Sequence, residues 1–176
     1  MTKSELAKAY FMEGYNCAQA VTLAFAEEMG LEKDKAARLA SSFGGGLGRL
    51  REVCGCVSGM ALAAGAICGY ADPKAREEKA EHYARIQRLA GDFRGKTGSI
   101  ICRELLAGVG RSDSSENGGV SAADVGQDTS PVPEERTESY YKKRPCSELV
   151  ALAAEILERE LKQEQEQEPV KKEAGH

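Results

Sequence analysis

The segment from Val53 to Ala71 carries no charged side chain over 19 residues, and it limits the possible folds more than any other part of the chain. Its length is close to that of a membrane-spanning helix, but it is rich in Gly and Ala and poor in bulky apolar side chains. Small residues recur in it at three- and four-residue spacing, which permits close contact between helices: Gly55, Gly59, Ala63 and Ala66. We therefore expect a helix buried among other helices, not a membrane span.

Helix-start signals recur along the rest of the chain. Thr2 with Glu5, and Asn16 with Gln19, have the spacing of capping boxes, and Asp72-Pro73 is typical of a helix start. No alternating apolar and polar run is long enough for a strand, and no repeat of 20–50 residues occurs. The sequence predicts an all-α fold: a compact bundle of about six helices, with a Gly-rich loop and a long polar loop before the last helix.

These elements are expected to form one domain. Residues 1–107 are predicted to be a helical core that contains Cys17, Cys54 and Cys102. Residues 108–139 are polar and rich in turn formers, which indicates a loop or a disordered insertion. A C-terminal helix over 140–162 then completes the same domain, and 163–176 are predicted to be a flexible tail.

Charge and composition exclude several classes of function. The formal net charge is −4, so no basic surface is expected to attract nucleic acid or a membrane. The first residues form no secretory signal, which favours a cytoplasmic protein, where cysteines more often bind metal or do redox work than form disulfides. Only two histidines are present, and no constellation for hydrolysis or acid–base catalysis can be built from them.

The six cysteines are the part of the composition that points to chemistry. Their spacing is neither that of a zinc ribbon or finger nor that of a ferredoxin. Four of them, however, lie at or near predicted helix starts: Cys17, Cys54, Cys102 and Cys146. Free N–H groups and the positive end of the helix dipole favour thiolate there, so converging helix starts would suit a metal–sulfur cluster or a reactive disulfide pair.

The other interpretation is that cysteines are small buried hydrophobic residues. Packing is the expected role of Cys68, which lies near the far end of the uncharged segment. Cys56 stands two positions after Cys54, where it fits a spare ligand or a resolving thiol, with packing slightly favoured.

A cluster of glycines directly precedes Cys54. It matches neither GxGxxG nor GxxxxGK[ST], so no nucleotide is expected. Close backbone approach explains it better, either to neighbouring helices or to something bound beside Cys54. The candidates for contact with a bound group are therefore Gly44, Gly45, Gly46, Gly55 and Cys56, and the flanking Arg49 and Arg51 would balance a thiolate or an anionic cluster.

Four blocks of this sequence, GYNCAQAV, FGGGLG followed by CGCVSG, GSIICRELL and RPCSELVALAAEIL, resemble the redox-active family named for its C_GCAxxG_C_C pattern. The resemblance implies a small redox protein with four defining cysteines: Cys17, Cys54, Cys102 and Cys146. Cys56 departs from it, since the family favours alanine there. The chain is also distantly similar to part of the split-Soret cytochromes, which carry an iron–sulfur centre besides haem, but it has no CxxCH for haem attachment.

The first hypothesis for function is therefore a four-cysteine site that binds an iron–sulfur cluster and exchanges electrons with an unidentified redox partner protein. A metal-free thiol–disulfide protein is the alternative, and a structural zinc site in a helical interaction module is the third. The sequence leaves open whether the chain is an oxidoreductase or an electron-transfer accessory protein. The apolar faces of its helices leave room for a homodimer.

Overall fold

The computed structural model describes residues 1–108 and 128–173, with the side chains of the last helix described as far as residue 166. Its helices are α1 (Lys3–Met12), α2 (Cys17–Ala24), α3 (Lys33–Ala40), η1 (Ser41–Phe43), α4 (Gly55–Cys68), α5 (Arg76–Thr97), α6 (Cys102–Leu106), α8 (Glu138–Lys143) and α9 (Cys146–Glu173). The described residues hold no strand beyond one antiparallel bridge between Val53 and Ile101. The all-α prediction is confirmed.

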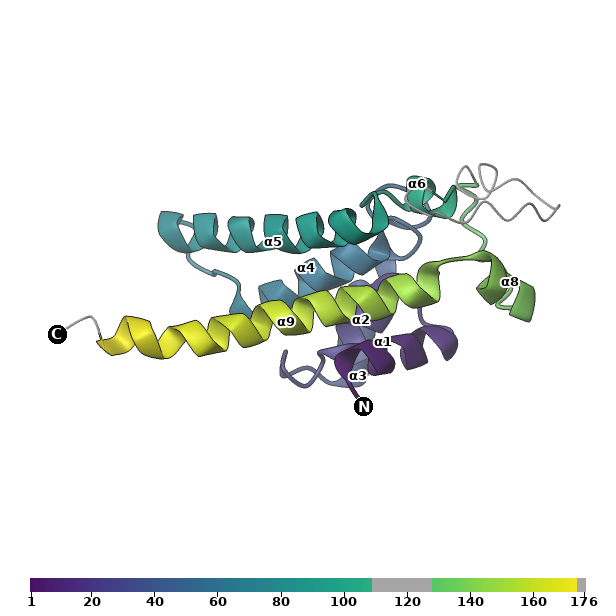
Figure 1. Ribbon diagram of the computed structural model, residues 1–176. Coiled ribbons are helices and arrows are strands. Elements are labelled where there is room, and N and C mark those ends of the chain that lie inside the picture. Colours follow the sequence, from purple (N-terminus) through teal and green to yellow (C-terminus); the bar gives the residue numbers. More distant parts are fainter. Residues whose placement is uncertain (109–127, 174–176) are drawn as a thin grey trace.

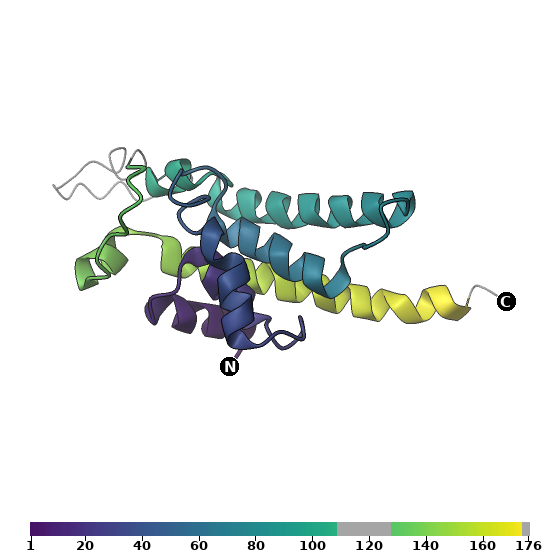
Figure 2. The same ribbon diagram turned by 180° about the vertical axis from the view of Figure 1, so that it is seen from behind.

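Helix α4 comes from the uncharged segment and lies at the centre of the bundle. Figures 1 and 2 show it between α5 and α9, and it also packs against α2. A Cβ atom at Gly59 would stand 2.9 Å from the carbonyl oxygen of Ala18, so only glycine allows α2 this close. The first part of α4 is buried as far as Ala64. No helix in the described residues combines the length and apolar character needed to cross a bilayer.

The core is assembled mainly from α1, α2, α4, α5 and α9. Its largest fully buried side chains come from five different parts of the chain: Phe11, Phe25, Met60, Phe93, Ile156 and Leu157. The two predicted capping boxes are present, because Thr2 and Asn16 each accept a hydrogen bond from the N3 backbone. Helix α2 therefore begins at Cys17, as the cap at Asn16 predicts.

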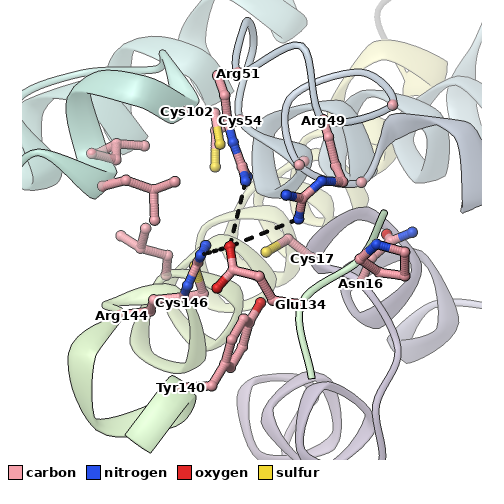
Figure 3. Close-up of a pocket in the computed structure, with 18 of the residues that line it drawn as sticks. Asn16, Cys17, Arg49, Arg51, Cys54, Cys102, Glu134, Tyr140, Arg144 and Cys146 are labelled. Carbon is pink, nitrogen blue, oxygen red and sulfur yellow. Dashed lines mark hydrogen bonds and ion pairs between the residues drawn. The ribbon is translucent and has the colours of Figure 1, made fainter. Parts of the chain in front are cut away.

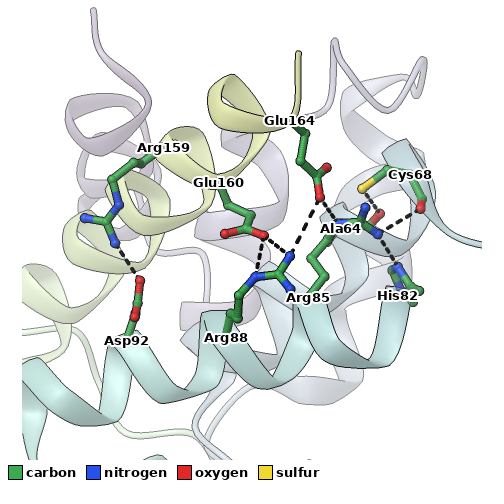
Figure 4. A network of polar contacts seen from close by, with 9 residues as sticks. All are labelled: Ala64, Cys68, His82, Arg85, Arg88, Asp92, Arg159, Glu160 and Glu164. Carbon is green, nitrogen blue, oxygen red and sulfur yellow. Dashed lines mark hydrogen bonds and ion pairs between the residues drawn. The ribbon is translucent and has the colours of Figure 1, made fainter. Parts of the chain in front are cut away.

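The end of the chain differs from the expectation of one helix over 140–162 and a flexible tail. The structure has a short α8, a break at Pro145, and then α9, which continues to Glu173; only 174–176 of the expected tail lie outside the described residues. No apolar stripe marks this extension, but Glu, Gln and Lys are good helix formers. The Arg85–Glu164 ion pair also fastens it to α5, and Arg88–Glu160 makes a second pair one turn earlier, each at 2.5 Å (Figure 4).

Helix α5 begins at Arg76, three residues after Pro73 and therefore later than the Asp72-Pro73 signal predicts. Helix α6 begins at Cys102, and the residues before it are extended and pair with the segment before α4. Most of the expected polar loop, 109–127, lies outside the described residues. Its last part, from Asp128 to Arg136, has no helix and contacts the glycine-rich loop through Arg49 and Arg51.

Candidate functional site

Four cysteines stand at the beginnings of four helices and line the same pocket. Cys17, Cys102 and Cys146 are the first residues of α2, α6 and α9, and Cys54 is the N-cap of α4. The pocket has a volume of about 310 Å³ and is shown in Figure 3. We refer to Cys17, Cys54, Cys102 and Cys146 as the helix-start cysteines.

A short backbone pairing places Cys54 beside Cys102. The N–H of Cys54 donates to the carbonyl oxygen of Ile100 at 2.8 Å, and the N–H of Cys102 donates to that of Glu52 at 2.6 Å. These bonds flank the bridge between Val53 and Ile101. Two helices that begin far apart in the sequence thus begin side by side.

The glycine-rich loop wraps closely around these helix starts. Gly46 has a φ of +70°, and a Cβ atom there would lie 2.7 Å from the Cβ of Cys102. A Cβ atom at Gly44 would lie 2.5 Å from the Cγ of Asn16, the residue that caps α2. Both distances are too short for any side chain, so close backbone approach explains the glycine cluster.

The predicted contact residues do not all reach the pocket. Gly44, Gly45 and Gly55 line it. Gly46 lies behind, packed against Cys102 and the backbone of Glu52. The same loop keeps Leu47, Arg49 and Arg51 in the left-handed region, with φ of 68°, 69° and 61°, an uncommon conformation for residues with side chains.

The thiols differ in their affinity for protons. Hydrogen bonds from Cys146 and Cys56 hold the pKa of the Cys17 thiol well below its ordinary value, helped by the charges of Arg136 and Arg144. The hydrogen bond to Cys17 raises the pKa of Cys146, and burial is the main cause that raises the pKa of Cys56. In the reduced site Cys17, at the positive end of α2, therefore releases its proton more easily than Cys56 and Cys146 do.

Cys102 and Cys68 show two further environments. Burial, reinforced by Cys54, raises the pKa of Cys102 to about 12. Cys68 lies at the other end of α4, where its thiol donates to the carbonyl oxygen of Ala64 at 3.1 Å. It is not among the residues of the pocket, in keeping with the packing role expected for it. Cys56 is fully buried and hydrogen-bonded to Cys17 and Cys54.

Arginine side chains surround a carboxylate at the same pocket. Oε1 of Glu134 accepts a hydrogen bond from Arg144, and it lies 3.8 Å from Arg49 Nη1 and 3.9 Å from Arg51 Nη2 (Figure 3). We call Arg49, Arg51 and Arg144 the arginine cluster. The guanidinium of Arg144 also stacks 4.6 Å from the ring of Tyr140.

Arg49 and Arg51 had a predicted role beside the cysteines, whereas Glu134, Arg136, Tyr140 and Arg144 had none. The only local signal was the run of basic and tyrosine residues before Cys146. Glu134 stands in a polar stretch that gives no hint of long-range contacts.

The side chains that could bind a metal do not form a preorganised site for a single ion. Within the described parts of the chain, no three or more His, Cys, Asp or Glu side chains are grouped as a single bound metal ion requires. A tetrahedral zinc site would hold four sulfurs about 2.3 Å from one centre.

Comparison with known proteins shows a family match. Residues 15–160 match the sequence family described as "Putative redox-active protein (C_GCAxxG_C_C)". No curated protein and no solved structure matched the chain. The matched range includes all of the helix-start cysteines and the residues of the arginine cluster.

Proposed function

Because this chain belongs to the redox-active protein family C_GCAxxG_C_C, we propose that its helix-start cysteines hold an iron–sulfur cluster for electron transfer. One observation carries the proposal: four cysteines from four separate helix starts line a single pocket. Four thiolates are the usual protein ligands of such clusters. When bound, a cluster of this kind accepts and releases single electrons at a potential that its surroundings adjust.

The donor set fits this group better than it fits zinc. Thiolates that bind several irons stand around a larger volume than those around one ion, and the helix-start cysteines line a pocket of about 310 Å³ without a preformed single-ion site. Thiolate ligands bring negative charge, which the guanidinium groups of Arg51 and Arg144 would offset. The zinc hypothesis has no such support.

The surrounding residues have defined tasks in this proposal. Helix starts supply unpaired backbone N–H groups that donate to thiolate sulfur, and such bonds adjust the reduction potential. Gly44 and Gly46 allow the loop to close around the site. Cys54 and Cys102 are buried, at 4% and 9% exposure, which limits water around their sulfurs.

Anaerobic reconstitution with iron and sulfide tests this proposal. We expect bound iron and acid-labile sulfide in the full-length protein, with loss of both by more than half when any helix-start cysteine is replaced by serine. Cys68→Ser is the matched control, because it removes a thiol from the same chain outside the pocket. Absence of bound sulfide, or an equal loss in Cys68→Ser, would contradict the proposal.

A second candidate is metal-free thiol–disulfide exchange, which the lowered pKa of Cys17 and the place of Cys146 in the same pocket favour. The Cys17 thiolate would attack one sulfur of a disulfide substrate and release a thiolate, forming a mixed disulfide. Cys146, after losing its proton, would then attack Cys17 and release the second thiolate. The substrate gains two electrons and two protons as a dithiol, and the protein retains a Cys17–Cys146 disulfide.

Thiol counting separates the two candidates. In the metal-free protein, equilibration with oxidised and reduced glutathione should change the number of free thiols by two if exchange occurs, and Cys146→Ala should abolish that change. A constant number of free thiols over the whole range of potentials would exclude the exchange mechanism.

A further inference from the structure

The arginine cluster has a geometry that suggests a ligand of its own. We propose that it binds the carboxylate of a small organic acid, and that Glu134 occupies this position when the ligand is absent. The inference goes beyond the redox role, and it concerns the metal-free protein, because the arginine cluster shares its pocket with the helix-start cysteines. It concerns Arg49, Arg51 and Arg144 together with the pocket that they border.

The first argument is unused hydrogen-bonding capacity. The side chain of Arg51 is 4% exposed, and among the described residues its Nη2 has no hydrogen-bond partner. The nearest carboxylate oxygen, Oε1 of Glu134, lies 3.9 Å from that nitrogen, beyond hydrogen-bond length. A buried guanidinium nitrogen without a partner costs free energy, so the site is built for more acceptor atoms than Glu134 provides.

The second argument is the way Glu134 is held. All its contacts with the arginine cluster are made by one oxygen, and its backbone belongs to the extended segment from Asp128 to Arg136. That segment is itself fixed, because Arg49 pairs with Asp128 at 2.8 Å. A free carboxylate has no such tether, and it can present both oxygens to guanidinium groups in the bidentate manner that they favour.

The third argument is access and space. The Glu134 side chain is 39% exposed, whereas those of Arg51 and Arg144 are 4% and 7% exposed, so Glu134 can leave without opening the core. The pocket of about 310 Å³ is at the small end of ligand sites. Its apolar lining suits a body of a few carbon atoms: Leu105, Leu106, Pro131, Pro133 and Leu149.

The test removes the internal carboxylate and supplies an external one. In metal-free, reduced, full-length Glu134→Ala, isothermal titration calorimetry should show saturable binding of propionate, at least tenfold tighter than in the wild type, where Glu134 competes. Glu138→Ala is the matched control, since Glu138 pairs with Lys142, away from the arginine cluster, and is 82% exposed. It should bind propionate as weakly as the wild type.

Two further titrations test whether the site prefers a carboxylate to other anions. Sodium chloride at equal ionic strength should give no saturable heat, and sulfate should bind Glu134→Ala at least tenfold more weakly than propionate. If Glu134→Ala does not fold, Glu134→Gln keeps the side-chain shape without its charge and should give the same order of affinities. No propionate binding in the folded variant, equal binding in Glu138→Ala, or sulfate binding as tight as propionate would each overturn the proposal. Because the measurement uses metal-free protein, its result is independent of cluster binding.

Discussion

Cys17 and Cys146 lie near opposite ends of the sequence, yet both line the pocket where α2 and α9 begin. The two thiols shift each other's pKa in opposite directions, down for Cys17 and up for Cys146. Helices α2 and α9 therefore meet at a thiol that loses its proton more easily than an ordinary cysteine does.

The pH dependence of Cys17 alkylation should reveal this arrangement. Since the pKa of Cys17 is lowered, its thiolate persists as pH falls below about 8.5, the ordinary cysteine value. Iodoacetamide labelling of reduced, metal-free protein, followed by mass spectrometry, should give a midpoint below that value. Cys146→Ala removes the main hydrogen bond and should move the midpoint upward, whereas Cys68→Ala should leave it in place. An unchanged midpoint in Cys146→Ala would contradict the assignment.

Two glycine-to-alanine substitutions should have effects of opposite sign. Gly46→Ala adds a side chain at φ +70° and 2.7 Å from the Cβ of Cys102, so we expect a loss of at least about 2 kcal/mol in the free energy of unfolding. Gly95→Ala lies within α5 with no atom within 4 Å and should stabilise by about 0.5–1 kcal/mol. Urea denaturation followed by circular dichroism measures both. A neutral Gly46→Ala would show that the loop does not pack as described.

The ion pairs that fasten α9 to α5 should differ in strength with burial. Glu164→Gln leaves the guanidinium of Arg85, which is 8% exposed, without its counter-charge, and should cost about 1–3 kcal/mol. Asp92→Asn breaks a pair whose side chains are 41% and 53% exposed, and should cost at most about 1 kcal/mol. Denaturation at low and high salt measures both. Equal costs would contradict the structural role of the Arg85–Glu164 pair (Figure 4).

His82 should make stability depend on pH below neutrality. Partial burial, together with the charge of Arg85, lowers its pKa below 6.5. The unfolded chain therefore binds this proton at higher pH than the folded chain, and stability is lost as pH falls from about 6.5 through the folded pKa. NMR titration of the ring, in a His176→Asn background, should give a midpoint below 6.5 that rises in Arg85→Met. A midpoint at or above 6.5 in the parent protein would refute this.

Local signals in the sequence predicted several parts of the site. The cap at Asn16 places Cys17 at a helix start, and the lack of charge in 53–71 predicts a buried helix. Close backbone approach was also the right explanation for the glycine cluster, because it is a requirement that single residues meet. Each of these inferences depends on a few neighbouring positions.

Long-range features were beyond such reasoning. The pairing of Val53 with Ile101 depends on two unrelated segments that happen to be extended together, and neither has a strand pattern. Glu134 looks like ordinary loop charge until Arg49, Arg51 and Arg144 surround it. The extension of α9 likewise depends on arginines of α5, and periodicity detects apolar partners but not ionic ones.

The separation of the helix-start cysteines along the chain has a mechanical consequence. Any covalent network that joins their sulfurs, whether through metal or directly, closes the backbone between Cys17 and Cys146 into rings that span most of the bundle. Ring closure reduces the conformational freedom of the unfolded chain, and long rings reduce it most. The redox conditions around this protein would then decide how firmly α2 and α9 are locked together.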